Sequence, residues 1–411
     1  MLRSEIAAYR SQYEKELFES VVPFWERYSF DRECGGYYSC IDRDGTIFDS
    51  DKFLWMQGRE LWGFSKLYNA VRPEARWLDA ARLGADFLRE HGKAPNGDWY
   101  FALDRSGRPL VQPYNIFSDC FCAAAFAGYS KASGEGWARD FAVGGYRRIQ
   151  ERKSNPKGIW TKQISENRPI KAMAMPMIQL WLAEEFADLI PEAELKPIVD
   201  ASMDQVLNLH IDRKEHVVFE RMFADGTHPD CMEGRLLNPG HALETLWLVL
   251  RVAEARGDRG LIEDVAEVML WTVERGWDEK YGGIFYYQDF KGFPTEKLES
   301  SMKLWWVHVE AIMAFLLAYK LTGKEVYETW FKRIHDWTWT HFPDPANGEW
   351  FGYLDRRGEV ALTLKGGKWK GFFHVPRALL NCATWLGEME RACAGGGEYK
   401  SPEERKMGAR A

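Results

Sequence analysis

The sequence lacks the motifs that mark several common enzyme classes. It has no GxxxxGK(S/T) phosphate loop, no GxGxxG after a strand, no HExxH and no GxSxG, so nucleotide-driven, hydride-transfer and serine-hydrolase chemistries lose support. His241 and Glu244 form a single His-x-x-Glu pair, without the second carboxylate–histidine helix that a di-iron centre needs. We therefore expect chemistry that requires neither a metal nor a cofactor.

Long apolar runs and a strongly basic charge are also absent. The best membrane-spanning candidate, residues 243–252, is interrupted by Glu244 and Arg251 and falls short of the roughly 18 residues that a bilayer requires. Residues 1–5 carry no apolar segment typical of a secretory signal. The net charge of −7 excludes a nucleic-acid binder that works by bulk electrostatics. Seven cysteines, with neither CxxC nor zinc-site spacing, indicate free thiols, so we expect a cytoplasmic protein.

Aromatic residues, in contrast, are abundant. The chain has 19 Trp, 17 Tyr and 24 Phe, which make up 15% of its residues. Such rings suit the walls of a sugar-binding cavity, but they also suit packing between large helices. The composition alone leaves both interpretations open.

One pattern recurs six times along the chain. A turn with glycine or a polar residue leads into a short aromatic or β-branched run, and a polar turn follows nine or ten residues later, as expected for a β-hairpin or strand pair. The closing turns fall at residues 45, 107, 167, 226, 292 and 358, which gives steps of 62, 60, 59, 66 and 66 residues. This near-constant spacing indicates an internal repeat, with room for two helices between successive turns.

Counting the helices in this repeat predicts the fold. Between the first two turns, residues 55–68 and 77–91 carry apolar side chains at three- and four-residue spacing. Five such pairs, with an N-terminal helix near 4–28 and a C-terminal one near 375–391, make twelve. They predict an all-α fold, a single (α/α)6 barrel of six inner and six outer helices with short β-hairpins at one mouth.

The domain boundaries follow from this count. We assign residues 1–392 to the barrel, as one catalytic domain. The remaining residues, 393–411, begin with a glycine-rich stretch, and we expect them to form a disordered tail.

Four reactive side chains lie at similar distances after the closing turns. Arg59, His241, His308 and His374 follow their turns by 14 to 16 residues, which places them near the starts of inner helices around one mouth of the barrel. We expect them to share a site, where helix N-termini favour an anion. A structural role is the alternative for each, and above all for His308, which follows two tryptophans and could be a buried, hydrogen-bonded histidine.

Three further residues are candidates for the site, although an ordinary structural role is the alternative for each. Glu244 lies on the same helix face as His241, and either Glu244 or Glu310 could orient a histidine, bind a hydroxyl group or remain a solvated carboxylate. Met175 lies in a methionine-rich segment, residues 171–177, that fits core packing as well as a contact with substrate.

Two histidines on different inner helices suit proton transfer near neutral pH. In the open-chain aldehyde form of a sugar, the hydrogen on C2 is acidic enough to be removed, leaving an enediolate-like anion. Inversion at C2 requires removal from one face and return to the other, so His241 and His374 favour epimerisation over an aldose–ketose isomerisation, which one base can perform. Arg59 would stabilise the anion at oxygen.

Four motifs carry a family resemblance, and they extend from about residue 50 to 380. They are Leu54-Trp55-Met56-Gln57-Gly58-Arg59, Asn238-Pro239-Gly240-His241-Ala242-Leu243-Glu244, Lys303-Leu304-Trp305-Trp306-Val307-His308-Val309-Glu310-Ala311 and Phe373-His374-Val375-Pro376-Arg377. In these motifs and their order the chain resembles the N-acylglucosamine 2-epimerases, also described as renin-binding proteins. Their superfamily includes cellobiose 2-epimerases and aldose–ketose isomerases, and its fold is the (α/α)6 barrel.

The resemblance implies an activity and the residues that perform it. These enzymes interconvert N-acetylglucosamine and N-acetylmannosamine. Their two acid–base histidines match His241 and His374, and their arginine at the reducing end of the sugar matches Arg59. Carboxylates that support ring opening and the histidines match Glu244 and Glu310.

The resemblance also implies the substrate contacts and the regulation. Aromatic walls match Trp247 and Trp306, and His308 in its Trp-Trp-x-His segment favours the N-acyl branch of the superfamily. ATP is an effector of the family that is not consumed, and homodimers are common. The basic segment Lys365-Gly366-Gly367-Lys368 could meet a phosphate, although an ordinary surface loop is the alternative.

Three alternative functions remain at this point. The first is an epimerase or aldose–ketose isomerase of unacylated sugars such as cellobiose or mannose. The second is an (α/α)6 glycoside hydrolase, in which a pair of carboxylates would be indispensable and the histidines dispensable. The third is a binding protein without catalytic activity.

Overall fold

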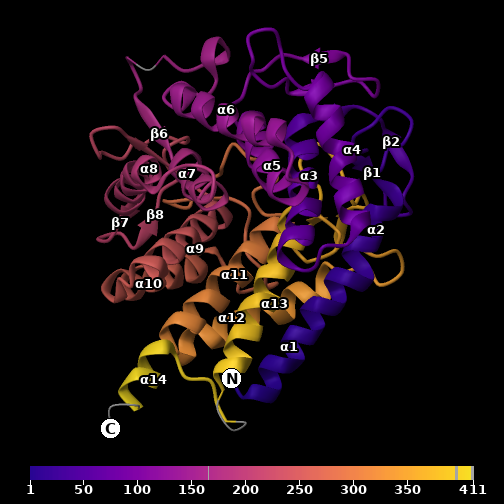
Figure 1. The fold of residues 1–411 in the computed structure, drawn as a ribbon. Coiled ribbons are helices and arrows are strands. Elements are labelled where there is room, and N and C mark those ends of the chain that lie inside the picture. The colour runs from indigo at the N-terminus through magenta and orange to yellow at the C-terminus, as the bar shows by residue number, and fades with distance from the viewer. Residues whose placement is uncertain (165, 394–396, 409–411) are drawn as a thin grey trace.

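The computed structural model describes residues 1–164, 166–393 and 397–408 (Figure 1). The helices are α1 (Arg3–Lys15), a π-helical segment (Glu16–Val21), α2 (Val22–Tyr28), α3 (Leu54–Ala70), α4 (Ala75–His91), α5 (Phe117–Ser133), α6 (Gly136–Arg152), a 3-10 turn (Gly158–Trp160), α7 (Ala174–Glu185), α8 (Glu192–Asp204), a second π-helical segment (Gln205–His210), α9 (Pro239–Arg256), α10 (Arg259–Gly276), α11 (Trp305–Thr322), α12 (Glu325–His341), α13 (His374–Ala392) and α14 (Pro402–Gly408).

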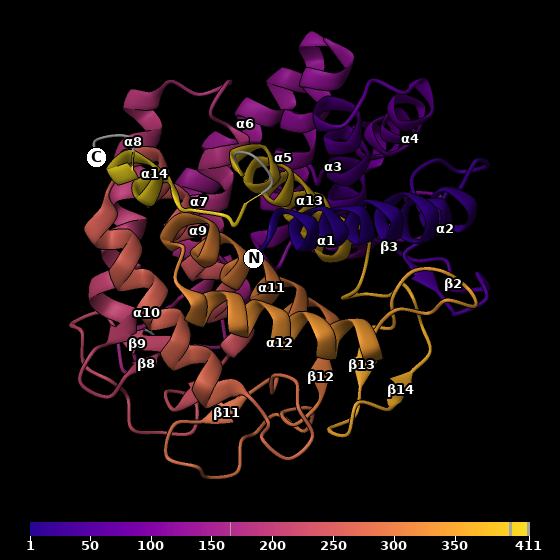
Figure 2. The ribbon, with the colours of Figure 1, turned by 90° about the horizontal axis from the view of Figure 1, so that it is seen from below.

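The helices form two concentric rings, as the repeat predicts. Helices α3, α5, α7, α9, α11 and α13 pack side by side in the inner ring, and each has an outer partner: α4, α6, α8, α10, α12 and the continuous helical stretch from α1 to α2. Figure 2, seen from below, shows α10 and α12 outside α9 and α11. The expected (α/α)6 barrel of twelve helices is thus the observed architecture.

The two rings differ in burial because only the inner helices are covered on all sides. In α5, 12 of 17 residues are buried, whereas its neighbour α4 in the outer ring buries 7 of 17 along one face. All 18 residues of α11 are buried, which explains why this helix is apolar all round rather than amphipathic. Within the part of the chain that the structure describes, no helix combines the length and apolarity needed to span a bilayer.

Short strands connect the helices at one end of the barrel. They are β1 (Cys40–Ile41), β2 (Ile47–Asp49), β3 (Lys52–Phe53), β4 (Ala102–Leu103), β5 (Pro109–Val111), β6 (Ile170–Ala172), β7 (Ile211–Asp212), β8 (Val217–Val218), β9 (Arg221–Phe223), β10 (Leu236–Leu237), β11 (Gln288–Asp289), β12 (Lys303–Leu304), β13 (Tyr353–Leu354) and β14 (Val360–Leu362).

Within the residues that the structure describes, three of the six expected hairpins form. Strands β1–β2, β4–β5 and β13–β14 pair antiparallel across Gly45, Gly107 and Gly358, each of which has a φ of 91° that favours glycine.

The other three repeats pair differently from the prediction. Strand β6 pairs with β9 and β10 with β11, so the strands bond between neighbouring repeats, while Gly158–Trp160 form a 3-10 turn. Backbone N–H and C=O groups need hydrogen-bond partners, but a strand of a neighbouring repeat satisfies them as well as one of the same repeat. The repeat pattern alone therefore does not specify which strands pair.

A recurring ion cluster links neighbouring repeats at this end of the barrel. In each of its three copies, a buried aspartate at the start of one repeat accepts hydrogen bonds from a buried lysine of the same repeat and from the arginine in the hairpin turn of the next repeat. The three clusters are Asp31 with Lys52 and Arg105, Asp278 with Lys303 and Arg356, and Asp344 with Lys365 and Arg43.

The third copy closes the ring, because it joins the last repeat to the first. Arg43 Nε and Nη2 lie 2.7 and 2.9 Å from the carboxylate oxygens of Asp344, a bidentate geometry that adds directional preference to the charge pairing. The arginines in the hairpin turns therefore also hold neighbouring repeats together at the mouth of the barrel.

The structure corrects the prediction of a disordered tail. Tyr399 is only 5% exposed and its hydroxyl donates a hydrogen bond of 2.7 Å to the carbonyl of Lys320, while Glu398 forms an antiparallel bridge with Leu2. Residues 402–408 form α14. A glycine-rich composition cannot reveal such anchors, which depend on one aromatic side chain meeting the end of α11. Residues 394–396 and 409–411 of the predicted tail lie outside the described residues.

The ion clusters give a prediction for stability. Burial opposes ionisation, but Arg356 and Lys303 together lower the pKa of Asp278 to about 2. A carboxyl with a lowered pKa stabilises the fold above its unfolded pKa, near 4, and loses that contribution as the pH falls toward 2. Asp278→Asn should therefore cost about 3 kcal/mol at pH 7, because it leaves Lys303 buried without a counter-charge.

Urea unfolding at a series of pH values tests this prediction. The difference in the free energy of unfolding between Asp278→Asn and the wild type should shrink as the pH falls from 5 to 2. The control is Asp140→Asn, a change at an exposed position on α6, which should unfold like the wild type at every pH. Equal stability of the two variants at pH 7 would contradict a stabilising role for the cluster.

Candidate active site

A cavity of about 740 Å³ opens at the end of the barrel where the inner helices begin. Each of the six inner helices contributes side chains from its N-terminal turns: Trp55 and Arg59, Phe117 and Phe121, Met177 and Trp181, His241 and Glu244, Trp305 and Trp306, and His374 and Arg377. Loop residues complete the rim, among them Tyr286, Tyr287, Lys297, Glu299, Tyr353 and Trp369. Because every helix N-terminus carries a partial positive charge, the cavity favours a negative charge on a bound molecule.

His241 stands on one wall of the cavity, at the third residue of α9. Asn238 caps this helix by accepting a hydrogen bond from the His241 backbone N–H, 3.2 Å away. The His241 Nδ1 lies 3.2 Å from both carboxylate oxygens of Glu220, which follows β8. Burial alone would lower the pKa of His241, but the charge of Glu220 and its hydrogen bond, together with smaller contributions from the charges of Glu244 and Glu310, outweigh that effect and raise it.

His374 stands on another wall, at the first residue of α13. Its Nδ1 donates a hydrogen bond of 2.7 Å to Glu310 on α11, and its side chain is 11% exposed. Burial lowers the pKa of His374 well below its usual range; the charge of Glu244 opposes this effect, and the nearby positive charges of Arg377 and Arg59 reinforce it. The environment therefore favours a neutral imidazole.

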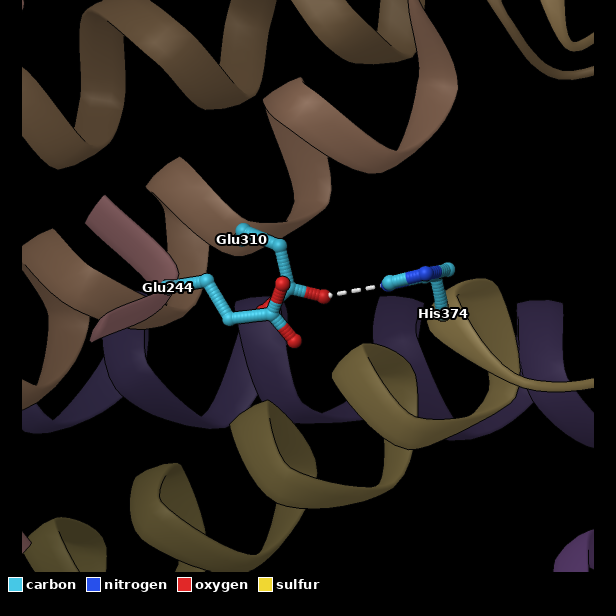
Figure 3. Close-up of side chains that lie close together, drawn as sticks. All are labelled: Glu244, Glu310 and His374. Carbon is cyan, nitrogen blue, oxygen red and sulfur yellow. Dashed lines mark hydrogen bonds and ion pairs between the residues drawn. The ribbon is translucent and has the colours of Figure 1, made fainter. Parts of the chain in front are cut away.

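A single arginine connects the carboxylates of the site. Arg377 Nη2 donates to Glu244 at 2.5 Å and to Glu310 at 2.6 Å, and Trp247 Nε1 donates to the other oxygen of Glu310 at 2.9 Å. Figure 3 shows Glu244 and Glu310 pointing toward each other from α9 and α11, with His374 bonded to Glu310 from α13. Three inner helices thus meet through one buried cation.

The same side chains are the ones in the site that could hold a metal ion. Ligand atoms of Glu244, Glu310 and His374 lie within 4.8 Å of one another. However, the Arg377 guanidinium lies within hydrogen-bond distance of both carboxylates and already supplies a shared positive charge to them. The donor set is therefore satisfied by a protein cation, and the expectation of metal-free chemistry stays a prediction.

Trp306 contacts both histidines. Its ring centroid is 5.1 Å from that of His241 and 5.8 Å from that of His374. The two imidazoles therefore line the same cavity next to one indole, and they come from two different inner helices, α9 and α13.

Arg59 points into the same space from α3 and is held by aromatic rings. Its guanidinium carbon lies 4.1 Å from the ring centroid of Phe121 and 5.0 Å from that of Phe373. Burial lowers the pKa of Arg59 to about 9, against the opposing charge of Glu244. Among the described residues, no carboxylate forms an ion pair with it, so its charge is available to an anion in the cavity.

Three residues that the sequence places in the site do not line the cavity. His308 is completely buried: Nε2 accepts a hydrogen bond from the N–H of Ile284, and Nδ1 donates to the carbonyl of Leu304. It lies two residues after Trp306, and two helical steps of about 100° turn it away from the cavity, against Trp337 of α12. The prediction that His308 contacts substrate is wrong, and its structural alternative is the observed one.

Met175 and Trp247 also lie outside the cavity lining, because of their positions on their helices. Helix α7 faces the cavity with Ala174, Met177 and Trp181, so Met175, one position after Ala174, falls on another side of the helix and accepts a weak hydrogen bond from Gln179. Trp247 is 2% exposed and supports Glu310 from beneath the cavity rather than forming a wall.

Two residues that shape the site were not predicted. Glu220 follows the Val217–Val218 strand, and only its position next to His241, 21 residues further along the chain, marks it as special. Arg377 stands in the last quoted motif, three residues after His374, but the sequence does not show which partners it meets. The i to i+3 spacing, which puts both side chains on one helix face, is the signal that could have found it.

The basic segment after β14 is not a flexible phosphate loop. Lys365 is fully buried, and its ammonium group bonds to Asp344 at 3.1 Å as part of the third ion cluster. Burial lowers the pKa of Lys365 to about 8. Lys368 remains exposed and lies over the rings of Phe101 and Trp369.

The buried arginine gives a prediction for stability. Arg377→Met should leave Glu244 and Glu310 without their shared counter-charge and lower the free energy of unfolding by about 3–5 kcal/mol. Arg251→Met is a suitable control, because Arg251 pairs with Glu184 and Glu254 on the surface and is 35% exposed. Urea unfolding followed by circular dichroism measures both; similar midpoints for the two variants would contradict the bridging role.

Comparison with known proteins gives one consistent result. The family model described as N-acylglucosamine 2-epimerase (GlcNAc 2-epimerase) matches residues 36–378. The chain is 37% identical to the N-acylglucosamine 2-epimerase of Mus musculus over 94% of both chains. It is 25% identical to the cellobiose 2-epimerase of Dictyoglomus turgidum, over 92% of this chain and 98% of that one. The solved structure of cellobiose 2-epimerase from Spirochaeta thermophila superposes with a TM-score of 0.79 at 25% identity, over 94% and 98% of the two chains.

Proposed function

The chain belongs to the N-acylglucosamine 2-epimerase family, and we propose that it interconverts N-acetylglucosamine and N-acetylmannosamine by moving the proton on C2. The observation that carries this proposal is the pair of imidazoles that line one cavity from α9 and α13, both next to Trp306, one held by Glu220 and the other by Glu310. Such a pair can remove a proton from one face of a carbon and return one to the other.

The reaction begins with the open-chain form of the sugar in the cavity. For one epimer, neutral His374 removes the C2 proton, and the electron pair of the C–H bond moves into the C1–C2 bond while the carbonyl oxygen becomes negative. The imidazolium of His241 then donates a proton to C2 from the opposite face, and the carbonyl re-forms. For the other epimer the two histidines exchange roles.

The surrounding charges support the intermediate. Arg59 offers a guanidinium without a carboxylate partner, which stabilises the developing oxyanion, and removal of one such donor typically costs about 10²–10³ in rate. Glu310 accepts from His374 Nδ1 and keeps the other ring nitrogen available as the base. Glu244 lines the cavity next to Arg377, where it can accept a hydrogen bond from a sugar hydroxyl during ring opening.

The inverting hydrolase, which is the form that the alternative describes, does not fit this geometry. Inverting glycosidases separate their two carboxyl groups by about 6.5–9.5 Å to hold a water molecule between them. In this cavity, oxygens of Glu244 and Glu310 lie within 4.8 Å of each other, and both bond to the same Arg377 nitrogen. Neither carboxylate is free to act as acid or base.

Three further properties are proposed on the strength of the family resemblance. ATP acts as an effector that is not consumed, the enzyme is a homodimer, and it works in the cytoplasm. The seven unpaired cysteines support the last point. Turnover with a non-hydrolysable ATP analogue, light scattering after gel filtration, and fractionation of the source cells test the three in turn.

The two histidines give the main prediction for activity. His241→Asn and His374→Asn should each lower kcat by about 10²–10⁴, the usual contribution of general acid–base catalysis, with unchanged circular dichroism spectra. His216→Asn serves as the control, because His216 stacks on Trp271 outside the cavity and has a φ of 49° that asparagine tolerates. A folded His241 or His374 variant that keeps more than about a tenth of wild-type activity, a loss below about 1.4 kcal/mol, contradicts the assignment.

The substrate itself is tested by proton NMR in D2O. N-acetylmannosamine, mannose and cellobiose are incubated separately with the protein, with and without ATP. We expect turnover of N-acetylmannosamine with incorporation of deuterium at C2. Turnover of mannose or cellobiose alone would replace the N-acyl substrate with an unacylated one, and no exchange into any sugar would favour a binding protein.

A further inference from the structure

We infer that Glu220 is the positioning residue of His241: it fixes the ring through Nδ1 and holds it as an imidazolium, so that His241 starts as the acid and His374 as the base. The inference rests on the proposed function, since it concerns how the two histidines divide the proton transfer. It adds that the two are not equivalent before substrate arrives.

The geometry of Glu220 suits this role. Its two carboxylate oxygens are both 3.2 Å from His241 Nδ1, its side chain is 11% exposed, and its backbone carbonyl accepts a hydrogen bond from the N–H of Met173. The carboxylate is thus held at a fixed place between β8 and α7. With Nδ1 engaged, Nε2 is the ring nitrogen of His241 that remains for the sugar.

Among the described carboxylates near the two histidines, Glu220 is the one whose negative charge is not balanced by an arginine or a lysine. Glu244 and Glu310 share the guanidinium of Arg377, and Arg59, which forms no ion pair with either, interacts with both at longer range, so these four charges sum to zero. Among the described residues, no lysine or arginine forms an ion pair with Glu220; its only such partner is His241. The negative charge of Glu220 is therefore balanced when His241 is protonated.

The remaining polar groups near His241 do not change this balance. Lys297 and Glu299, at the rim, carry opposite charges. Tyr286 and Tyr287 are neutral at physiological pH, since burial raises the pKa of both.

The dyad of His374 has the opposite character. Its carboxylate partner, Glu310, already accepts hydrogen bonds from Arg377 and Trp247, and the Arg377 Nη2 lies 3.4 Å from His374 Nδ1. Protonation of His374 would place two cations side by side. The site thus holds two carboxylate–histidine pairs. In Glu220–His241 the carboxylate has no other cation among the described residues, whereas in Glu310–His374 it is already bonded to Arg377. This difference assigns His241 as the acid and His374 as the base.

The test is an NMR titration of the imidazoles in protein labelled with 15N-histidine, with His241 assigned from its absence in His241→Asn. In Glu220→Gln, which keeps the size of the side chain and removes its charge, the pKa of His241 should fall by at least one unit. Glu220→Asp should restore part of the shift. The matched control is Glu215→Gln, a surface carboxylate in the turn that precedes β8, which should leave the titration unchanged.

Activity measurements complete the test. A fall of one pKa unit lowers the imidazolium fraction tenfold at high pH but hardly at all well below the pKa, so kcat/KM of Glu220→Gln should drop about tenfold at pH 8.5 and much less at pH 5.5. A loss that is equal at all pH values would indicate a purely structural role and overturn the inference, as would an unchanged pKa of His241.

The titration uses no sugar, so it separates the two failures. If the pKa of His241 falls in Glu220→Gln while His241→Asn retains full activity, the ion pair exists but the proposed function is wrong. If His241→Asn is inactive but the pKa of His241 is the same in the wild type and in Glu220→Gln, the proposed function stands and this inference fails.

Discussion

The site depends on one buried cation, the guanidinium of Arg377. It is shared by Glu244 of α9 and Glu310 of α11, and it stands one helical turn after His374 on α13. Taking these charges out of water is costly, and only complete pairing makes the arrangement tolerable. Because the pairing joins three inner helices, the position of His374, the neutral state of its ring and the packing of that half of the barrel are fixed together.

The two histidines differ because their carboxylate partners differ. Glu310 is neutralised by Arg377, whereas Glu220 has only His241, and burial then favours the neutral ring in one case while the unpaired charge favours the protonated ring in the other. Inversion at a carbon needs one group that can accept a proton and another that can give one. The same cavity supplies both because the helix N-termini and Arg59 favour the anion that forms between them.

The repeat made the fold and half of the site predictable from sequence. The six turns between residues 45 and 358 and the helical periodicity between them predicted the number of helices, since local turn chemistry and burial periodicity follow from residue type. Similar offsets of 14 to 16 residues from the turns identified Arg59, His241 and His374, but they also selected His308, because an offset does not record rotation about the helix axis. Glu220 lies on a connecting segment, where strand pairing departs from the repeat, and its contact with His241 is purely tertiary.

The most direct test of the two-base account follows deuterium at C2 in each histidine variant, with each epimer supplied separately in D2O. If His241 and His374 serve opposite faces, His241→Asn should still exchange the C2 proton of one epimer without epimerising it, and His374→Asn should exchange only the other epimer. The double variant should exchange neither while remaining folded. Exchange of the same epimer by both single variants would show that the two imidazoles do not address opposite faces, and the account would be wrong.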